Sequence, residues 1–185
     1  MSIKDKIINE MAEQMQLTDY DYERLKYGFM VLYINISKTI ILIVCAIILG
    51  IIKETAILFF AFSCVRLTGF GPHSDSTIKC TIVGLIQFIG GTYLAMLLPS
   101  FSIITCMGMY LLSILVCSLY APIATKKRPI SDTRRKFFKI TTLMTVTGLF
   151  LIALCMGETL YRNLIIIGVL VEDMMLLPIM KKIIL

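Results

Sequence analysis

The sequence predicts an all-α integral membrane protein with six transmembrane helices and an N-terminal amphipathic helix. Three observations support this fold class. Hydrophobic residues make up 58% of the 185 residues, and the mean hydropathy is +0.88. Much of the chain consists of apolar runs close to the roughly 20 residues that cross a bilayer as a helix. Basic residues gather between these runs. We therefore expect one membrane domain over residues 1–185 and no separate soluble domain.

The first 27 residues are expected to form the amphipathic helix. Apolar residues recur at helical spacing among Lys, Asp and Glu, and they are Ile3, Ile7, Ile8, Met11 and Met15. Such a helix lies on a membrane surface with its apolar face inserted. Packing against the cytoplasmic ends of the spans is an equally good interpretation of the same pattern.

Six apolar runs follow, separated by short turns or polar segments. They cover residues 32–52, 55–67, 81–98, 103–119, 141–156 and 164–179. The second run is short, and Gly69-Phe70-Gly71-Pro72 is expected to break its helix after Arg66, which would mark the membrane interface. In these terms residues 28–119 hold spans one to four, residues 120–140 form a basic loop, and residues 141–180 hold spans five and six.

The distribution of Lys and Arg predicts the orientation, because short loops rich in these residues stay on the cytoplasmic side. Residues 122–139 contain one acid, Asp132, and seven bases, which are Lys126, Lys127, Arg128, Arg134, Arg135, Lys136 and Lys139. Counting spans from this cytoplasmic loop places both termini and the 66–79 turn on the same side. We expect a multi-pass protein of the cell membrane with cytoplasmic termini.

Several residues inside the apolar runs need partners or have packing roles. Glu172 and Asp173 should face the protein interior, water or a basic partner such as Lys38, because uncompensated acids are costly in a membrane. Gly90-Gly91 would permit close helix contact, either within the chain or in a homodimer. Five of the six cysteines lie in apolar runs, where cysteine behaves as a small hydrophobe. With one histidine and no CxxC pattern, the sequence predicts no structural metal.

Polar residues that suggest chemistry gather in the turn between the second and third runs. They are Arg66, His73, Ser74, Asp75, Ser76, Lys79 and Cys80. One of the three residues 74–76 is expected to cap the third helix, which would place Cys80 in its first two turns near the positive end of the dipole. A cysteine needs a positive environment or a base to form its nucleophilic thiolate. Arg66 and Lys79 would add positive potential, and His73 is the candidate base.

The spacing of His73 and Cys80 restricts how the two side chains could meet. Seven residues are nearly two helical turns, which would place the two Cα atoms about 10 Å apart in a straight helix. That distance excludes a direct hydrogen bond, so His73 must precede the helix and fold back over its start, or contact must wait for substrate. Taken alone, a histidine in a polar turn is more often solvated or capping than catalytic, and an isolated cysteine more often packs.

Two stretches of the sequence carry a family resemblance. The first runs from Arg66 through Gly71 and His73 to Cys80, and the second contains Tyr120-Ala121-Pro122 and Lys126-Lys127-Arg128-Pro129-Ile130. Together with the length, the six runs and the basic loop, they make the chain similar to the accessory gene regulator B family, which are membrane endopeptidases of Gram-positive quorum sensing. The likeness covers nearly the whole chain. It departs from the family pattern at Phe70, where a glycine often stands, and at Pro72.

The resemblance implies that Cys80 and His73 are catalytic, with Arg66, Gly71 and Ser76 as supporting residues. The implied substrate is an AgrD-like precursor signal peptide with an acidic C-terminal tail. Cys80 would attack the peptide bond before the tail, while His73 takes the thiol proton and later protonates the leaving amine. The acyl-thioester would then pass to a cysteine or serine of the peptide and close a thiolactone or lactone ring. No cofactor or metal is implied.

The basic loop gives an electrostatic argument for the same substrate. Lys126, Lys127 and Arg128 would attract an acidic tail, although such clusters commonly act as topogenic signals and contact lipid headgroups. Nucleic acid is not an expected partner. Two other classes stay open. One is a small transporter that uses Lys38 and the two acids of the last run as pathway groups, and the other is a non-catalytic membrane scaffold that binds acidic partners.

Overall fold

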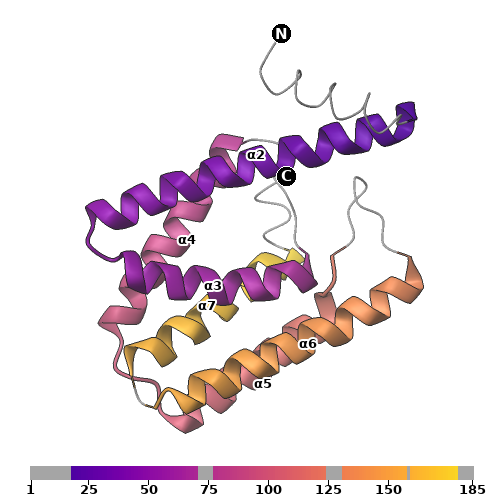
Figure 1. Ribbon diagram of the computed structural model, residues 1–185. Coiled ribbons are helices and arrows are strands. Elements are labelled where there is room, and N and C mark those ends of the chain that lie inside the picture. The colour runs from indigo at the N-terminus through magenta and orange to yellow at the C-terminus, as the bar shows by residue number, and fades with distance from the viewer. Residues whose placement is uncertain (1–17, 71–76, 124–130, 158, 179–185) are drawn as a thin grey trace. The chain divides into compact units, whose positions relative to one another are not determined.

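The computed structural model describes residues 18–70, 77–123, 131–157 and 159–178, and within these ranges it contains six α-helices and no strand. The helices are α2 (Asp19–Ile48), α3 (Ile52–Gly69), α4 (Thr77–Leu97), α5 (Ile103–Tyr120), α6 (Asp132–Cys155) and α7 (Leu160–Leu176) (Figure 1). The all-α prediction is therefore confirmed for the described residues. The chain divides into two compact units, residues 1–44 and 45–185. The second unit holds α3 to α7 and positions the candidate site.

The structure corrects the bounds of the first expected span. We expected an amphipathic segment followed by a span at residues 32–52, whereas α2 is one continuous helix from Asp19 to Ile48. Residues 1–17 lie outside the described part of the chain. The helix ends in a Schellman turn, in which Gly50 N–H donates to the Ile47 carbonyl and Ile51 N–H to the Ala46 carbonyl, both at 3.0 Å. Gly50 has a φ of +70°, which explains the glycine at this position.

The basic segment is also partly helical. We expected a loop over residues 120–140, but α6 begins at Asp132, so four of the seven bases belong to its first two turns. They are Arg134, Arg135, Lys136 and Lys139. Arginine and lysine are good helix formers, and the Arg135 N–H already bonds the Ser131 carbonyl at 2.8 Å. The helix therefore starts before the apolar run that was used to predict it.

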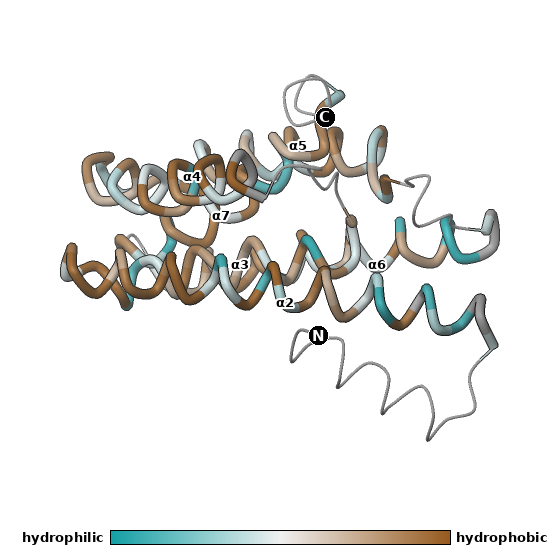
Figure 2. Tube along the Cα trace, turned by 90° about the horizontal axis from the view of Figure 1, so that it is seen from above, coloured by the Kyte–Doolittle hydropathy of each residue, from teal (hydrophilic) through white to brown (hydrophobic). Residues whose placement is uncertain are grey.

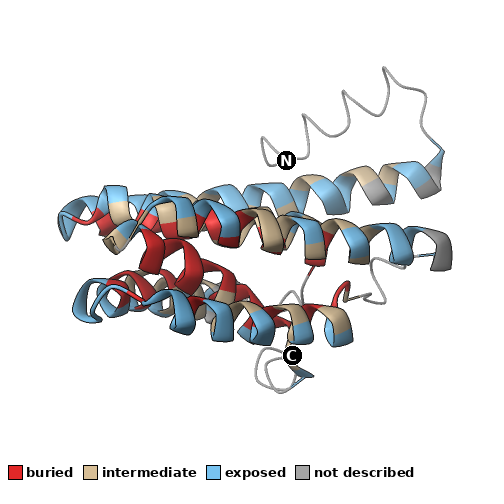
Figure 3. Ribbon diagram, turned by 90° about the horizontal axis from the view of Figure 1, so that it is seen from below, coloured by how far each residue is buried: buried red, intermediate tan, exposed pale blue. Residues whose placement is uncertain are grey.

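α7 is the core of the second unit. It contacts α3, α4, α5 and α6. Its residues are buried from Arg162 to Val169 and from Val171 to Asp173 (Figure 3). A helix that is hydrophobic nearly all round belongs in the interior of a bundle. The remaining helices of the unit are also largely apolar (Figure 2). They expose many large apolar side chains, as expected of surfaces that face lipid.

α3 and α7 approach each other closely at Gly168. A Cβ added there would lie 2.6 Å from the Leu58 carbonyl oxygen and 2.9 Å from the Ala61 Cβ. Small residues allow such close backbone contact between membrane helices. On α4, a Cβ at Gly91 would lie 3.2 Å from Leu58 Cδ1, whereas one at Gly90 would meet nothing within 4 Å. The close contact predicted for this glycine pair is thus made within the chain, by Gly91.

The first turn of α7 caps the ends of two neighbouring helices. The Asn163 side chain accepts from Phe101 N–H at 2.9 Å and donates to three carbonyl oxygens at the end of α4, those of Ala95, Leu98 and Pro99. Arg162 donates to three more, those of Phe101, Ala153 and Leu154. Helix C-termini leave carbonyls without intrahelical partners and attract cations. These two buried side chains therefore satisfy backbone groups at the helix ends that have no intrahelical partner.

Three helices are long and apolar enough to cross a membrane, judged by length and composition. They are Asp21–Ile48, Ile103–Tyr120 and Arg134–Cys155, and a shorter apolar helix covers Thr81–Leu97. The chain is thus a membrane protein by composition, with three of the six expected spans supported. α3 falls outside this set because it carries three charged residues, and α7 because it has only 17 residues, three of which are also charged. Two of these charges, one from each helix, pair with each other in the site described next.

Candidate functional site

Cys80 is the fourth residue of α4, which begins at Thr77. This confirms the prediction that Cys80 lies in the first two turns of the helix. The first turn of a helix has backbone N–H groups without intrahelical partners and carries the positive end of the helix dipole. The other predicted site residues of the two connecting segments lie outside the described residues, and they are Gly71, His73, Ser76, Lys126, Lys127 and Arg128.

α4 is fixed against α3 through its C-terminal half. The Phe88 ring makes edge contacts with Phe59 and Phe62 of α3, with ring centroids 5.2 and 4.9 Å apart. The hydroxyls of Thr55 and Thr92 are 3.3 Å apart in the buried interface. Cys80 precedes Phe88 by eight residues, or about 12 Å along the helix. The candidate nucleophile is therefore about two turns from a well-packed helix contact.

The end of α3 is held by an unusual residue, Phe70. The helix ends at Gly69, as the break expected at Gly69-Phe70-Gly71-Pro72 required, and Phe70 has a φ of 51° in the left-handed region. Few residues other than glycine adopt this conformation without support. The Phe70 ring packs edge-on against Phe138 of α6, with centroids 4.7 Å apart. Phe70 thus has a packing role at the point where the chain leaves α3.

The segment that carries Lys126 to Arg128 starts beside the end of α3. Ile123, just after α5, donates its backbone N–H to the Gly69 carbonyl at 3.2 Å. We call this contact the Gly69–Ile123 junction. A Cβ added at Gly69 would lie 3.6 Å from Thr142 Cγ2, so α6 also borders this point. Residues 71–76 and 124–130, which carry most of the predicted site residues, therefore leave the described fold from adjacent positions.

Arg66 and Glu172 form a buried ion pair between α3 and α7. Arg66 Nη1 donates to both carboxylate oxygens of Glu172, at 3.1 and 3.3 Å. The Glu172 side chain is fully buried and that of Arg66 is 21% exposed. The prediction that Glu172 faces the interior is confirmed, and its basic partner is Arg66.

A second polar cluster joins α5 to α7. Cys117 Sγ donates to Asp173 Oδ1 at 3.3 Å, and both residues are buried. Ser113 lies one turn before Cys117, and its Oγ and Asp173 Oδ2 are buried without a hydrogen-bond partner among the described residues. The sequence predicts Cys117 to be a small hydrophobic residue, whereas in the structure it makes this polar contact. The signal was present, because two adjacent acids in an apolar run require polar groups on a facing helix.

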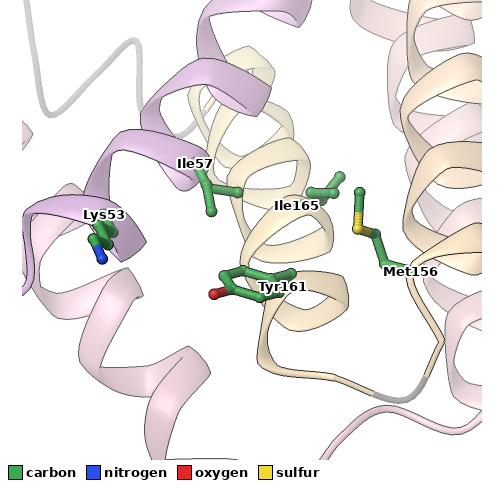
Figure 4. A pocket seen from close by; sticks show the side chains of 5 residues that line it. All are labelled: Lys53, Ile57, Met156, Tyr161 and Ile165. Atoms are coloured by element: carbon green, nitrogen blue, oxygen red, sulfur yellow. The ribbon is translucent and has the colours of Figure 1, made fainter.

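An open cavity of about 550 Å³ lies away from these residues. Its walls are Lys53 and Ile57 at the start of α3, Met156 at the end of α6, and Tyr161 and Ile165 of α7 (Figure 4). These residues border the first turn of α7, whereas Glu172 lies near the last. Because eleven residues of helix separate Tyr161 from Glu172, about 16 Å along the axis, the cavity is not part of the candidate site.

Comparison with known proteins places the chain in a family. The family model for accessory gene regulator B matches residues 4–177. Accessory gene regulator protein B of Staphylococcus epidermidis is 32% identical over 183 residues, which cover 97% of this chain and 93% of that protein. The Staphylococcus aureus (strain Newman) protein of the same name is 31% identical over 188 residues, covering 97% and 96%. A putative AgrB-like protein of Clostridium acetobutylicum is 30% identical over 193 residues, covering 99% and 91%.

No solved structure matches the chain. The family model spans nearly the whole sequence, and the relatives are matched over most of their own length. These agreements extend well beyond the two short stretches that first suggested the likeness. The protein belongs to the accessory gene regulator B family.

Proposed function

We propose that this protein is a membrane cysteine endopeptidase that removes the C-terminal tail of an autoinducer precursor peptide and promotes its cyclisation. Family membership points to autoinducer peptide processing in quorum sensing. The observation that carries the finer proposal is the position of Cys80 in the first turn of α4, preceded by Arg66, Gly71 and His73 in the family's order. A thiol at this position gains from the helix dipole when it ionises.

The proposed reaction has two acyl-transfer steps. In the first, Cys80 Sγ attacks the carbonyl carbon before the tail, the C–N bond breaks, and the tail leaves as an amine protonated by His73. In the second, a cysteine or serine of the peptide attacks the thioester carbonyl, and Cys80 is released as a thiol. A thioester retains enough acyl-transfer potential to close a thiolactone or lactone without ATP.

We propose a six-span topology with both termini and the active site on the cytoplasmic side. The basic residues of segment 122–139 support this orientation. α3 and α7 are 18 and 17 residues long, about 27 and 25 Å, which is close to the hydrocarbon thickness of a bilayer. Their charges do not argue against spanning, because Arg66 and Glu172 pair with each other and Arg162 is bonded to carbonyls.

Cys80→Ala is expected to abolish tail release, and His73→Ala to lower its rate by about 10²–10⁴-fold. The measurement is co-expression with the precursor peptide, followed by mass spectrometry of the released tail and of the acyl-enzyme. Cys155→Ala is the control, because Cys155 is an exposed cysteine at the end of α6. Tail release by the Cys80→Ala protein at the rate of the control would refute the endopeptidase proposal.

Replacing Lys126, Lys127 and Arg128 together by glutamine is expected to raise KM for the precursor about tenfold with little change in kcat. Exposed ion pairs contribute about 0.5 kcal/mol each, so losing three costs about 1.5 kcal/mol, which corresponds to roughly a tenfold change in affinity. The control is the triple glutamine variant of Arg134, Arg135 and Lys136, which removes the same charge from the exposed start of α6. Equal KM changes in both variants would show that only the overall charge of the segment matters.

A further inference from the structure

The Arg66–Glu172 ion pair is the feature whose role the proposed function leaves open. Both residues lie within apolar stretches of their helices, and the Glu172 carboxylate is fully buried. Burying two charges is costly, and a hydrophobic pair of similar size is often as stabilising. The clearest physical benefit of such a pair is specificity, because it fixes which residues face each other. What this pair fixes is the last turn of α3.

The contacts around Arg66 are specific in geometry. A single nitrogen, Nη1, reaches both oxygens of Glu172, and the guanidinium also lies over the Phe62 ring, 5.9 Å from its centroid. The neighbouring acid, Asp173, makes a different contact, with Cys117 of α5. The two acids of α7 therefore have separate tasks, and only Glu172 is bonded to α3.

Arg66 is directly coupled to the exit of the chain from α3. Its carbonyl accepts the Phe70 N–H at 3.2 Å, and Phe70 holds the left-handed conformation that ends the helix. Between them lies Gly69, whose carbonyl bonds Ile123. A rotation or shift of α3 that separated Arg66 from Glu172 would move all of these contacts. The ion pair thus fixes the place from which residues 71–76 and 124–130 depart.

We propose that Glu172 is a positioning residue of the endopeptidase: by holding Arg66, it sets the end of α3 and so the approach of His73 to Cys80. This inference rests on the proposed function. The inference also gives Arg66 a different role. Because Glu172 balances its charge inside the fold, Arg66 mainly holds the end of α3 in place and contributes less to stabilising a thiolate at Cys80. Both residues then act on kcat through geometry, and neither binds the peptide.

The test is a double-mutant cycle on purified protein with the precursor peptide. Glu172→Gln and Arg66→Gln are each expected to lower kcat by about a hundredfold, the loss typical of a misplacement near 1 Å, with KM changed less than twofold. The double variant should be no worse than the poorer single variant, because each change breaks the same contact. The matched cycle pairs Arg66→Gln with Asp173→Asn, because Asp173 contacts Cys117 and not Arg66. In this cycle the two losses in kcat should multiply.

A charge exchange, Arg66→Glu with Glu172→Arg, keeps the test decisive if a single variant fails to fold. The exchange is expected to recover at least tenfold of the lost kcat and to restore the elution profile of a folded protein. The positioning role would be overturned if the losses in kcat multiplied in the Arg66/Glu172 cycle. It would also be overturned if the exchange variant folded but were as inactive as the single variants. Cys80→Ala in the same assay separates the two proposals. Tail release without Cys80 would refute the endopeptidase proposal. The coupling between Arg66 and Glu172 could then still be measured by thermal unfolding.

Discussion

Replacing Gly168 by valine is expected to destabilise the second unit by about 3 kcal/mol or more, at the upper end of what overpacking costs. Even the first added atom, Cβ, would lie 2.6 Å from a backbone oxygen of Leu58, and a backbone atom cannot rotate away as a side chain can. α3 and α7 would have to separate along their shared interface. Because α7 is the central helix, this separation would also disturb its contacts with the other helices of the unit.

The measurement is the midpoint of thermal unfolding in detergent, together with the fraction of protein that elutes as a single species. Gly148→Val is the control, because Gly148 also lies within a helix, α6, but a Cβ there meets nothing within 4 Å. Gly168→Ala gives an intermediate case, in which a gain in helix propensity of about 1 kcal/mol opposes the clash. Equal midpoints for the two valine variants would mean that the close approach of α3 and α7 does not exist in solution.

Asn163→Ala is the second substitution with a large expected effect, a loss of several kcal/mol in the free energy of unfolding. The side chain is 1% exposed and makes four hydrogen bonds to backbone groups that end α4 and begin the following turn. Each buried group left without a partner costs about 1–3 kcal/mol. Phe101 N–H loses its bond outright, and no smaller side chain can reach all the carbonyls at once.

The expected readout is a lower unfolding midpoint and faster backbone hydrogen exchange in residues 98–103, with no effect on the proposed tail release while the protein stays folded. Asn35→Ala is the control, because Asn35 is an exposed residue within α2. Asn163→Asp should recover the Phe101 bond but lose the donated ones, giving a partial loss. An Asn163→Ala protein as stable as the control would show that the bonds at 2.9–3.4 Å contribute little.

The sequence could predict those parts of the fold that depend on local patterns. The break after Gly69, the helical position of Cys80 and the bounds of α5 follow from glycine and proline placement and from uniform apolar runs. The apolar run alone predicts too late a start for α6, because the basic residues before the run also favour helix. Local helix propensity is therefore a better guide to this helix start than hydropathy.

The pairings between helices could not be predicted in the same way. Glu172 needed a basic partner, but Lys38 and Arg66 satisfy that requirement equally well until the contact between α3 and α7 is known. The sequence gives no sign of the contacts of Asn163 and Arg162 with backbone carbonyls, because the polar end of an apolar run is usually a solvated turn. The close approach of α3 and α7 at Gly168 could not be predicted either. A glycine within a helix indicates such a contact only when its neighbour on the facing helix is known. In each case the missing information was which helix faces which.

The Gly69–Ile123 junction sets a limit on the reach of the substrate. His73 is four residues from one side of the junction and Lys126 is three from the other, and an extended chain covers at most about 3.5 Å per residue. The imidazole-bearing residue and the first base of the loop are therefore tethered within about 30 Å of each other, the span of roughly nine extended residues. Under the proposed function, a precursor that contacts both residues at once therefore needs no more than about nine extended residues between the bond to be cut and its first acid.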